Sequence, residues 1–519
     1  MIDRRSQIQS RKLSSQPVRK GAAFLGMAAV MMLAGCAVSP QPISPEARQL
    51  RADQLLAQMT SDQEPVVAPI DLYSAMARAI KYNLDYRVEV MEQALRVKEL
   101  DLAHYDMLPK VVGNLNYNGR SNEPGSRSKS LLTGETSLEP SSSSERNQLA
   151  TDLTMSWDVL DFGLSYVRAQ QRADSVMLAE ESKRKVIQRI IEDVRAAYWR
   201  AVSAERLLTK TRSLEASTER ALEHAHRQQR SQLTAPLPAL SYERELLTIR
   251  RDLESLTREL KVAKQQLAAL MNLPPEQHYE LVLPSRDLAW AGIDLSYDAM
   301  LKLAVMNRPE LREVAYQLRN NQREGTAAIL ETLPSLKLFA GANYSDDDFL
   351  YNSDWVTWGA HASWNLLKVF SLPARQERIE AQSELLDARG LALTMAVATQ
   401  VSVTRARYQL RRGELDTARR FLEVQRAIED QVSAGYQAQH VSEQTLIREQ
   451  MNTLLAEVRM DQALSDLQGA YANVYTATGI DAVDAGMSSD ESVAELSADL
   501  RRLWASRGDA LALERVGRS

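Results

Sequence analysis

Cys36 is the only cysteine in this chain of 519 residues, and its thiol is the most distinctive reactive group of the sequence. Basic residues precede it, followed by an apolar run over residues 22–33 and then by the small residues Ala34 and Gly35. Basic, apolar and small residues in this order are typical of a secretory signal with a cleavage site. The apolar run has 12 residues, fewer than the ~20 that a membrane-spanning helix needs. The sequence therefore predicts an exported chain with its single thiol at the cleavage site.

The segment from Leu33 to Cys36 resembles the lipobox of bacterial lipoproteins, in which the cysteine becomes the acylated first residue. The resemblance implies that residues 1–35 are a lipoprotein signal peptide and that Cys36 carries palmitate. Ala37 in place of an aspartate favours, by the same resemblance, sorting to the outer membrane. The alternative is a plain secretory signal with a chance cysteine.

The remaining candidates for catalytic or metal chemistry form no such pattern. His224 and His226 are two positions apart, so they lie on different faces of a helix. The sequence contains no phosphate-binding glycine loop, nucleophile elbow or zinc-protease motif. We therefore predict no enzymatic activity, no cofactor and no metal site. A net charge of −5 without a long basic tract after the signal argues against nucleic acid as a partner.

An internal repeat organises the rest of the chain. The segment Asp71–Met76 recurs as Asp294–Met300, and in both copies an asparagine, Asn83 or Asn307, follows the methionine after seven positions. Each copy then runs through a proline, two alternating stretches, a very long helical region, a break and a shorter helical run. Residues 70–280 and 281–480 therefore predict two copies of helix, strand, strand, long helix, short helix. Residues 36–69 are interpreted as a linker and residues 481–519 as a polar tail with weak helical character and no assigned function.

The four predicted strands alternate between apolar and polar residues, as strands with one face in lipid and one in water do. The apolar faces are Val111, Gly113, Leu115 and Tyr117; Leu149, Leu153, Met155, Trp157 and Val159; Leu336, Leu338, Ala340, Ala342 and Tyr344; and Val356, Trp358, Ala360, Ala362 and Trp364. The polar, serine-rich stretch 123–147 is interpreted as a flexible loop between the first two strands. The alternative is a pair of soluble hairpins with one face on a core.

The helical segments differ greatly in length. Leu164–Gln229 contains no glycine or proline over about 66 residues, or ~100 Å of helix. The expected segments flanking the long helices are Leu72–Leu108 and Ala239–Met271 in the first copy, and Ser296–Leu333 and Val441–Thr476 around Pro373–Ala434 in the second. Their lengths predict two short helices stacked end to end beside each long one. Leucines and similar residues from Leu246 to Leu270 recur at spacings of three and four, which indicates a coiled-coil seam.

One chain supplies only four strands, whereas a membrane barrel needs at least about eight. An open sheet edge in lipid would leave backbone groups without partners, so a lone copy cannot cross a membrane. Cyclic association is the usual solution. Two copies supply eight strands and three supply twelve, and only the larger ring leaves an open lumen.

Residues 70–480 resemble the TolC-like outer-membrane efflux proteins, in their lipoprotein branch. The resemblance depends on the duplicated plan, on Asn83 and Asn307, on Pro109 and Pro334 before the strands, and on the stretch 157–163 (WDVLDFG). It implies a mostly α, α+β fold, with long coiled-coil helices and β-hairpins. In that family a homotrimer forms a twelve-stranded transmembrane β-barrel, continued by an α-helical periplasmic tunnel.

The same resemblance implies the function and the partners. The protein would be the outer-membrane channel of a tripartite efflux or type I secretion system, passively conducting substrates from an inner-membrane pump or ABC exporter through a periplasmic adaptor protein. It would lie in the outer membrane, anchored by lipid, and extend into the periplasm. Drugs, metal ions, polysaccharide and secreted protein would use the same duct, because the inner-membrane partner selects the cargo. The alternative is a lipid-anchored periplasmic coiled-coil scaffold without channel activity.

The resemblance also suggests where the adaptor binds, at the two helix breaks. The expected contact residues are Ser231, Gln232 and Leu233 in the first break, and Ala434, Gly435 and Tyr436 in the second. Glu443 is the nearest candidate for a gate residue, and its alternative is an ordinary solvated helix position. We interpret the many Glu and Arg residues of the helices as solvated faces with pairs four positions apart.

Overall fold

The computed structural model describes residues 40–61, 63–230, 236–274, 277–286, 293, 296–484, 486–487 and 490–507. The chain divides into two compact units, residues 1–62 and 63–519. The signal peptide and Cys36 lie outside the described residues. In the first unit, the predicted linker contains helix α2 (Pro45–Met59), capped by Ser44, and every residue of this helix is exposed.

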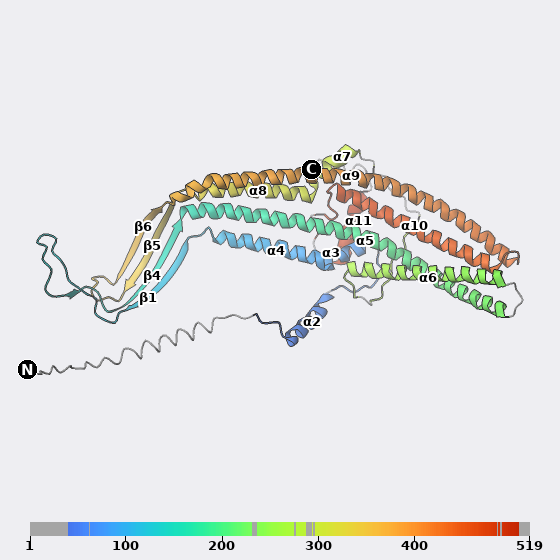
Figure 1. Cartoon of the computed structure of the whole chain (residues 1–519), viewed down its shortest axis with the longest axis horizontal. Helices are drawn as coiled ribbons and strands as arrows, with labels where there is room; N and C mark the ends of the chain where they lie inside the picture. Colours follow the sequence, from blue (N-terminus) through green and yellow to red (C-terminus); the bar gives the residue numbers. More distant parts are fainter. Residues whose placement is uncertain are drawn as a thin grey trace, which may run out of the picture. The chain divides into compact units, whose positions relative to one another are not determined.

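The second unit confirms the duplicated plan (Figure 1). The first copy contains α3 (Leu72–Tyr82), α4 (Leu84–Tyr105), β1 (Lys110–Gly119), β2 (Gly125–Ser126), β3 (Ser141–Ser142), β4 (Asn147–Asp158), α5 (Val159–Arg230) and α6 (Pro236–Leu270). The second contains α7 (Tyr297–Asn307), α8 (Pro309–Leu330), β5 (Ser335–Ser345), β6 (Asp354–Ser363), α9 (Leu366–Gln437) and α10 (Glu443–Ala477), followed by α11 (Val493–Ser506). Corresponding helices have equal lengths of 11, 22, 72 and 35 residues.

The structure corrects the expectation of one continuous helix before each hairpin. Asn83 ends α3 and caps α4, because its side chain accepts a hydrogen bond from the Tyr86 amide at 3.2 Å. In the second copy Arg308 stands at the joint and Pro309 begins α8. A proline lacks the amide that would continue α7, but it fits the first position of a new helix. Pro373, the expected start of the second long helix, instead lies inside α9.

The helices form two rows that share both long helices. Toward the strands, α4 packs on α5, α5 on α8 and α8 on α9; toward the far end, α6 packs on α5, α5 on α10 and α10 on α9. The short helices follow one another along α5, since the Asn83 amide donates to the Leu270 carbonyl at 3.2 Å. The predicted seam from Leu246 to Leu270 is buried as far as Leu267, and Leu270 is half-buried. Helices α4, α6 and α9 therefore lie at the edges of the rows, and α5, α8 and α10 lie inside.

The four long strands form one antiparallel sheet in the order β1-β4-β5-β6, and the short strands β2 and β3 pair in a separate sheet. Their register confirms the alternation, because Gly113, Leu153, Ala342 and Val356 form one row across all four strands. On the opposite face the Asn114 amide donates to Asp152 at 2.9 Å, and the Asn343 amide donates to Thr357 at 3.0 Å. The apolar side chains of the first face are largely exposed. The described helices include none with the length and apolarity of a bilayer span.

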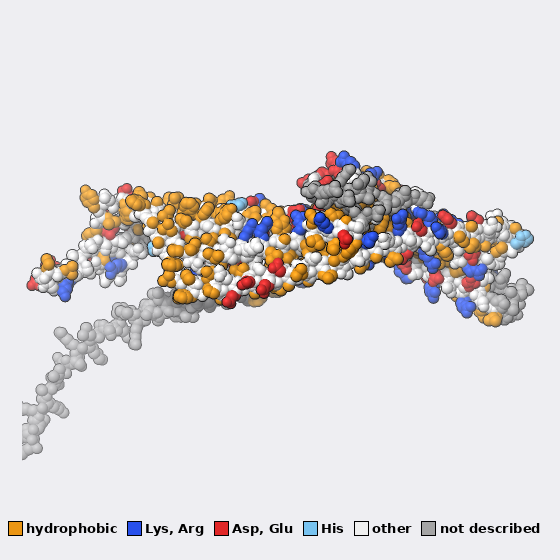
Figure 2. All heavy atoms as spheres, turned by 90° about the horizontal axis from the view of Figure 1, so that it is seen from above, with side chains coloured by type: hydrophobic (Ala, Val, Ile, Leu, Met, Phe, Trp, Pro, Cys, Tyr) orange, Lys and Arg blue, Asp and Glu red, His pale blue; other side chains and the backbone are white. Residues whose placement is uncertain are grey.

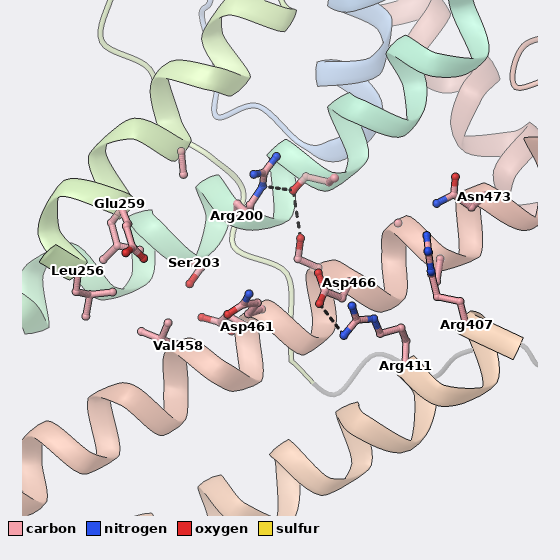
Figure 3. Close-up of a pocket in the computed structure, with 17 residues that line it drawn as sticks. Arg200, Ser203, Leu256, Glu259, Arg407, Arg411, Val458, Asp461, Asp466 and Asn473 are labelled. Atoms are coloured by element: carbon pink, nitrogen blue, oxygen red, sulfur yellow. Dashed lines mark hydrogen bonds and ion pairs between the residues drawn. The ribbon is translucent and has the colours of Figure 1, made fainter. Parts of the chain in front are cut away.

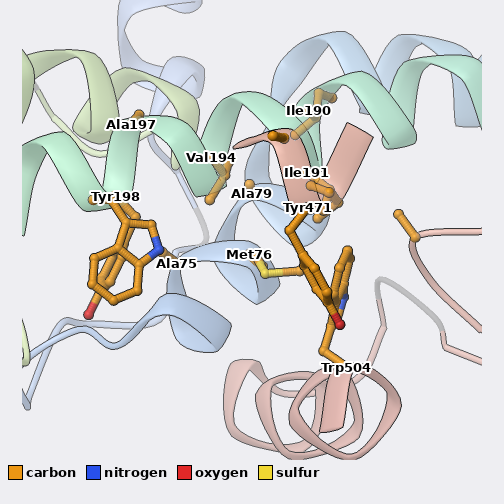
Figure 4. Packing of buried hydrophobic residues seen from close by; sticks show 14 of the residues in the cluster. Ala75, Met76, Ala79, Ile190, Ile191, Val194, Ala197, Tyr198, Tyr471 and Trp504 are labelled. Atoms are coloured by element: carbon orange, nitrogen blue, oxygen red, sulfur yellow. The ribbon is translucent and has the colours of Figure 1, made fainter. Parts of the chain in front are cut away.

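The main core surrounds α3 (Figure 4). Met76 of α3 lies among Ile191 of α5, Tyr471 of α10 and Trp504 of α11. Helix α11 revises the interpretation of residues 481–519 as a polar tail, because Leu496 and Leu500 are fully buried against this core. The Trp504 ring also lies 4.2 Å from the Arg195 guanidinium and 4.7 Å from that of Arg507. Residues far beyond the second copy therefore help to hold the first one.

Candidate functional site

The turn between α9 and α10 is a tightly bonded helix end. The Gly435 carbonyl accepts from the amides of His440 at 2.8 Å and Val441 at 3.3 Å, and Gln439 has a positive φ of 62°. A Cβ on Gly435 would lie 2.7 Å from a methyl group of Val441, so the glycine allows the chain to fold back closely. Ala434 and Tyr436 belong to the same last turn of α9, and Tyr436 is exposed. The structure thus brings the three predicted residues of this break together.

The structure describes only part of the tip between α5 and α6. Helix α5 ends at Arg230 and α6 begins at Pro236. The predicted contact residues Ser231, Gln232 and Leu233 lie outside the described residues.

Glu443, the candidate gate residue, lies at the start of α10 and contacts the first hairpin. Its carboxylate lies 3.8 Å from Nδ1 of His224 in α5. The two groups form an ion pair only when the histidine is protonated. Nearby, the Gln444 amide donates to Glu245 of α6 at 2.5 Å, and Arg448 lies 3.6 Å from the same carboxylate. The two hairpins are therefore joined by polar contacts close to their ends.

A buried charged node joins α5, α9 and α10 along the helices. The Glu457 carboxylate accepts from Lys210 of α5 at 2.7 Å and from Arg426 of α9 at 2.8 Å. Arg286 contacts both oxygens of Asp461 at 2.7 Å. Burial by itself raises the pKa of Glu457, but the hydrogen bonds from Lys210 and Arg426 outweigh it, so the pKa lies below its ordinary value.

A second set of buried acids joins α5 to α8. Asp174 contacts Arg319 at 2.9 Å and Arg323 at 2.5 Å, and Glu181 contacts Arg312 of α8 at 3.1 Å. Burial raises the pKa of Glu181 in spite of its arginine neighbours. The interpretation of the helix charges as solvated faces was therefore wrong at these positions. No local pattern of the sequence marks these acids, because the arginines that face them belong to α8, which is distant in the chain.

A pocket of about 520 Å³ lies among α5, α6, α9 and α10, and Figure 3 shows the residues that line it. Charged side chains of both signs line it, and Arg411 pairs with Asp466 at 3.1 Å. Among the described residues, no group of His, Cys, Asp and Glu could hold a metal ion. Ser465 of the pocket donates to the Ala196 carbonyl at 3.2 Å, so this hydroxyl, like the Arg411–Asp466 pair, joins neighbouring helices.

The exposed surface differs between the two ends of the second unit. Figure 2 shows apolar side chains over the end that carries the sheet and the adjoining helices, and charged side chains gathered toward the hairpin tips. Strand and helix residues such as Val356, Trp358, Leu367 and Phe370 contribute to the apolar end. An exposed apolar surface of this extent indicates contact with lipid or with another protein chain.

Comparison with known proteins finds a family domain in the first copy of the repeat. Residues 76–273 match the family model described as "Outer membrane efflux protein". Among curated proteins, none matches the chain. The first copy of the repeat thus carries an outer-membrane-efflux-protein domain, and the resemblance to the TolC-like family is confirmed.

Solved structures show the same fold. The outer-membrane channel CmeC of Campylobacter jejuni matches with a TM-score of 0.61 at 15% identity, covering 89% of this chain and 99% of that one. The channel OprN matches at 0.59 and 17% identity, covering 79% and 89%, and the open MtrE channel of Neisseria gonorrhoeae at 0.56 and 16%, covering 79% and 89%. These proteins are channels and not enzymes, in agreement with the prediction from the sequence.

Proposed function

We propose that three copies of this chain form an outer-membrane channel that passively conducts substrates out of the cell. The observation that carries the proposal is a comparison of the two long helices. Because α5 and α9 have equal lengths, each residue of α5 corresponds to the residue 207 positions later in α9. Leu214 and Ala221 of α5 are 6% and 0% exposed, whereas the corresponding Phe421 and Ile428 are 48% and 42% exposed. The edge helix α9 thus exposes apolar side chains at positions where the interior helix α5 is covered by other helices of the chain.

Helix α4 supplies a surface that α9 of another copy could cover. Its apolar residues Leu84, Val88, Met91, Leu95, Leu102 and Tyr105 are exposed and follow the spacing of a coiled-coil seam, interrupted once by Lys98. Inside one chain, α5 packs on α8 of the other copy of the repeat. Packing of α9 on α4 of the next chain would repeat that contact and continue the row around a ring.

The sheet supports the same assembly. Strands β1 and β6 are free at the two edges, and one face of the sheet is apolar and exposed. Pairing of β6 with β1 of the next chain would remove every edge and give twelve strands from three chains. The apolar face would then lie against lipid, and the face with Asn114, Asp152 and Asn343 would line the lumen of a transmembrane β-barrel.

At the other end, we propose that the tips meet a periplasmic adaptor protein linked to an inner-membrane pump or ABC exporter. Exposed Tyr436 beside the tight turn at Gly435 suits a contact with such a partner. Glu443 would take part in a gate, since it lies between the two hairpins. Acylation of Cys36 would anchor the chain in the outer membrane, and the mass of the mature N-terminal peptide tests it.

The native mass of the detergent-extracted protein, corrected for bound detergent, tests the assembly. A stable trimer is expected, and its insertion into planar bilayers should give discrete conductance steps. A folded monomer without conductance would overturn the channel and favour the lipid-anchored coiled-coil scaffold.

A further inference from the structure

The loop between β1 and β4 carries a second, smaller hairpin, which we call the finger (residues 127–139). The Ser137 amide donates to the Ser128 carbonyl at 2.9 Å, and the Ser130 amide donates to that of Glu135 at 2.9 Å. Lys129 and Thr136 form an antiparallel bridge, and Gly134 has a positive φ of 72° in the closing turn. The loop predicted from its serine-rich sequence therefore contains a hydrogen-bonded hairpin at its apex.

Two leucines stand at the apex of the finger with no cover. Leu131 is 102% exposed and Leu132 is 98% exposed. Removal of such side chains from water is favourable, so this apex favours contact with an apolar partner. The corresponding loop between β5 and β6 has only eight residues and carries no such finger. Each chain therefore contributes one finger.

The charges of the finger indicate what kind of partner fits. Arg127 and Lys129 lie before the apex, and Glu135 and Glu139 lie after it. Because two positive and two negative charges balance, a negatively charged membrane surface offers the finger no net attraction. A second copy of the same finger offers opposite charges to both groups.

The finger is long enough to reach its copies. Leu132 lies thirteen positions after Gly119, the end of β1, and a chain of that length extends up to ~40 Å. Twelve strands about 4.8 Å apart and tilted by about 40° close into a ring with a radius of about 12 Å. Leu132 can therefore reach the centre of the mouth.

We propose that the three fingers meet over the outer mouth of the channel and bury Leu131 and Leu132 against one another. The apex would then form an apolar closure that separates the lumen from the outside until cargo parts the fingers. The inference rests on the proposed trimer and adds a closing element at the end opposite the hairpin tips. Such a constriction would restrict water and ions while it stays closed.

A cysteine at the apex tests the contact, because Cys36 is the only other cysteine of the chain. In the full-length Leu132→Cys trimer, mild oxidation should link pairs of chains, since a disulfide needs Cβ atoms ~3.5–4.5 Å apart. Three cysteines at one axis allow one disulfide, so linkage should level off at about two thirds of the chains. Tyr351→Cys is the matched control, because Tyr351 is 100% exposed in the other loop and should not cross-link.

Conductance gives an independent measurement. The Leu131→Ser, Leu132→Ser double variant should raise the open probability of the channel several-fold, whereas Tyr351→Ser should leave it unchanged. A trimer of normal mass without cross-linking through Leu132→Cys, or with unchanged conductance in the serine variant, would overturn the closure but not the channel. A monomeric mass of the unaltered chain would instead overturn the channel itself.

Discussion

The two copies of the repeat are built from helices of equal length, but their surroundings are reversed. In the first copy the long helix α5 is interior and the short helices α4 and α6 lie at edges. In the second copy the short helices α8 and α10 are interior and the long helix α9 lies at an edge. The same order and lengths of helices therefore occur in two environments. The two copies differ in which of their side chains are apolar, charged, buried or exposed.

The comparison is sharpest between α6 and α10. The seam toward the long helix is common to both, since Leu253, Leu260 and Leu267 are buried and so are Met460, Leu467 and Val474, each 207 positions later. The other side differs, because Asp461 is buried in the charged node whereas the corresponding Glu254 of α6 is exposed and pairs with Arg250. The apolar seam thus packs the short helix on the long one in both copies. The opposite face of the short helix, buried in α10 and exposed in α6, determines which further helices contact the hairpin.

The largest expected effect comes from a glutamate placed at equivalent positions of the two long helices. Ala221→Glu buries a carboxylate inside the chain, without a designed partner, and should prevent stable folding or lower stability by ~3–5 kcal/mol. Ile428→Glu should leave the chain folded but abolish the trimer, because only the contact between chains loses apolar surface. Circular dichroism melting and native mass measure both outcomes. A trimer that survives Ile428→Glu would show that α9 does not face another copy.

Asp461→Asn should destabilise the chain by about 3 kcal/mol, because Arg206 would lose its carboxylate partner and Arg286 would keep only Glu457, at 3.9 Å. Glu254→Gln, the matched change at the edge helix, should cost at most ~0.5 kcal/mol. Urea unfolding of both variants at one fixed protein concentration measures the two losses in the free energy of unfolding. Equal losses would mean that the two helices do not differ in environment as described.

The acid dependence of the node follows from the lowered pKa of Glu457. A carboxylate whose pKa is lower in the folded state stabilises the fold above its unfolded pKa of ~4.3 and loses this contribution as the pH falls through the folded value. Glu457→Gln should therefore lower stability at pH 7 and weaken the further loss of stability below about pH 4. Urea midpoints measured from pH 7 to pH 3 test this, and an unchanged acid slope would argue against the role of Glu457.

The smallest effect concerns the tips, where the first copy has Pro236 and the second has Gly435. Alanine normally stabilises a helix by ~0.5–1 kcal/mol over glycine, but a Cβ here would meet Val441 at 2.7 Å. Gly435→Ala should therefore lower stability by about 1 kcal/mol. In a Val441→Ala background the same change should be neutral or stabilising. A stabilising Gly435→Ala in the unaltered chain would show that the turn opens without cost.

The local pattern of the sequence already determined the elements and their order. Alternating strands, the seam from Leu246 to Leu267 and the long stretch without glycine or proline each specify a structure through spacing alone. The duplication was visible because helix lengths and prolines recur in order. The joint at Asn83 was harder to predict, because an asparagine inside a helical pattern ends the helix only when its side chain caps the next one. The joint at Arg308 depends instead on Pro309, since the Arg308 side chain forms no cap.

Tertiary structure alone decided which equivalent faces are interior and which are free. Helix α11 illustrates this, since its polar sequence conceals Leu496 and Leu500, which are buried only because α3 lies beside them. Asp174 and Asp461 look like ordinary solvated acids until α8 and residue 286 bring arginines to them. Burial and charge pairing depend on neighbours distant in the chain, whereas the period of a helix or strand depends on residues a few positions apart.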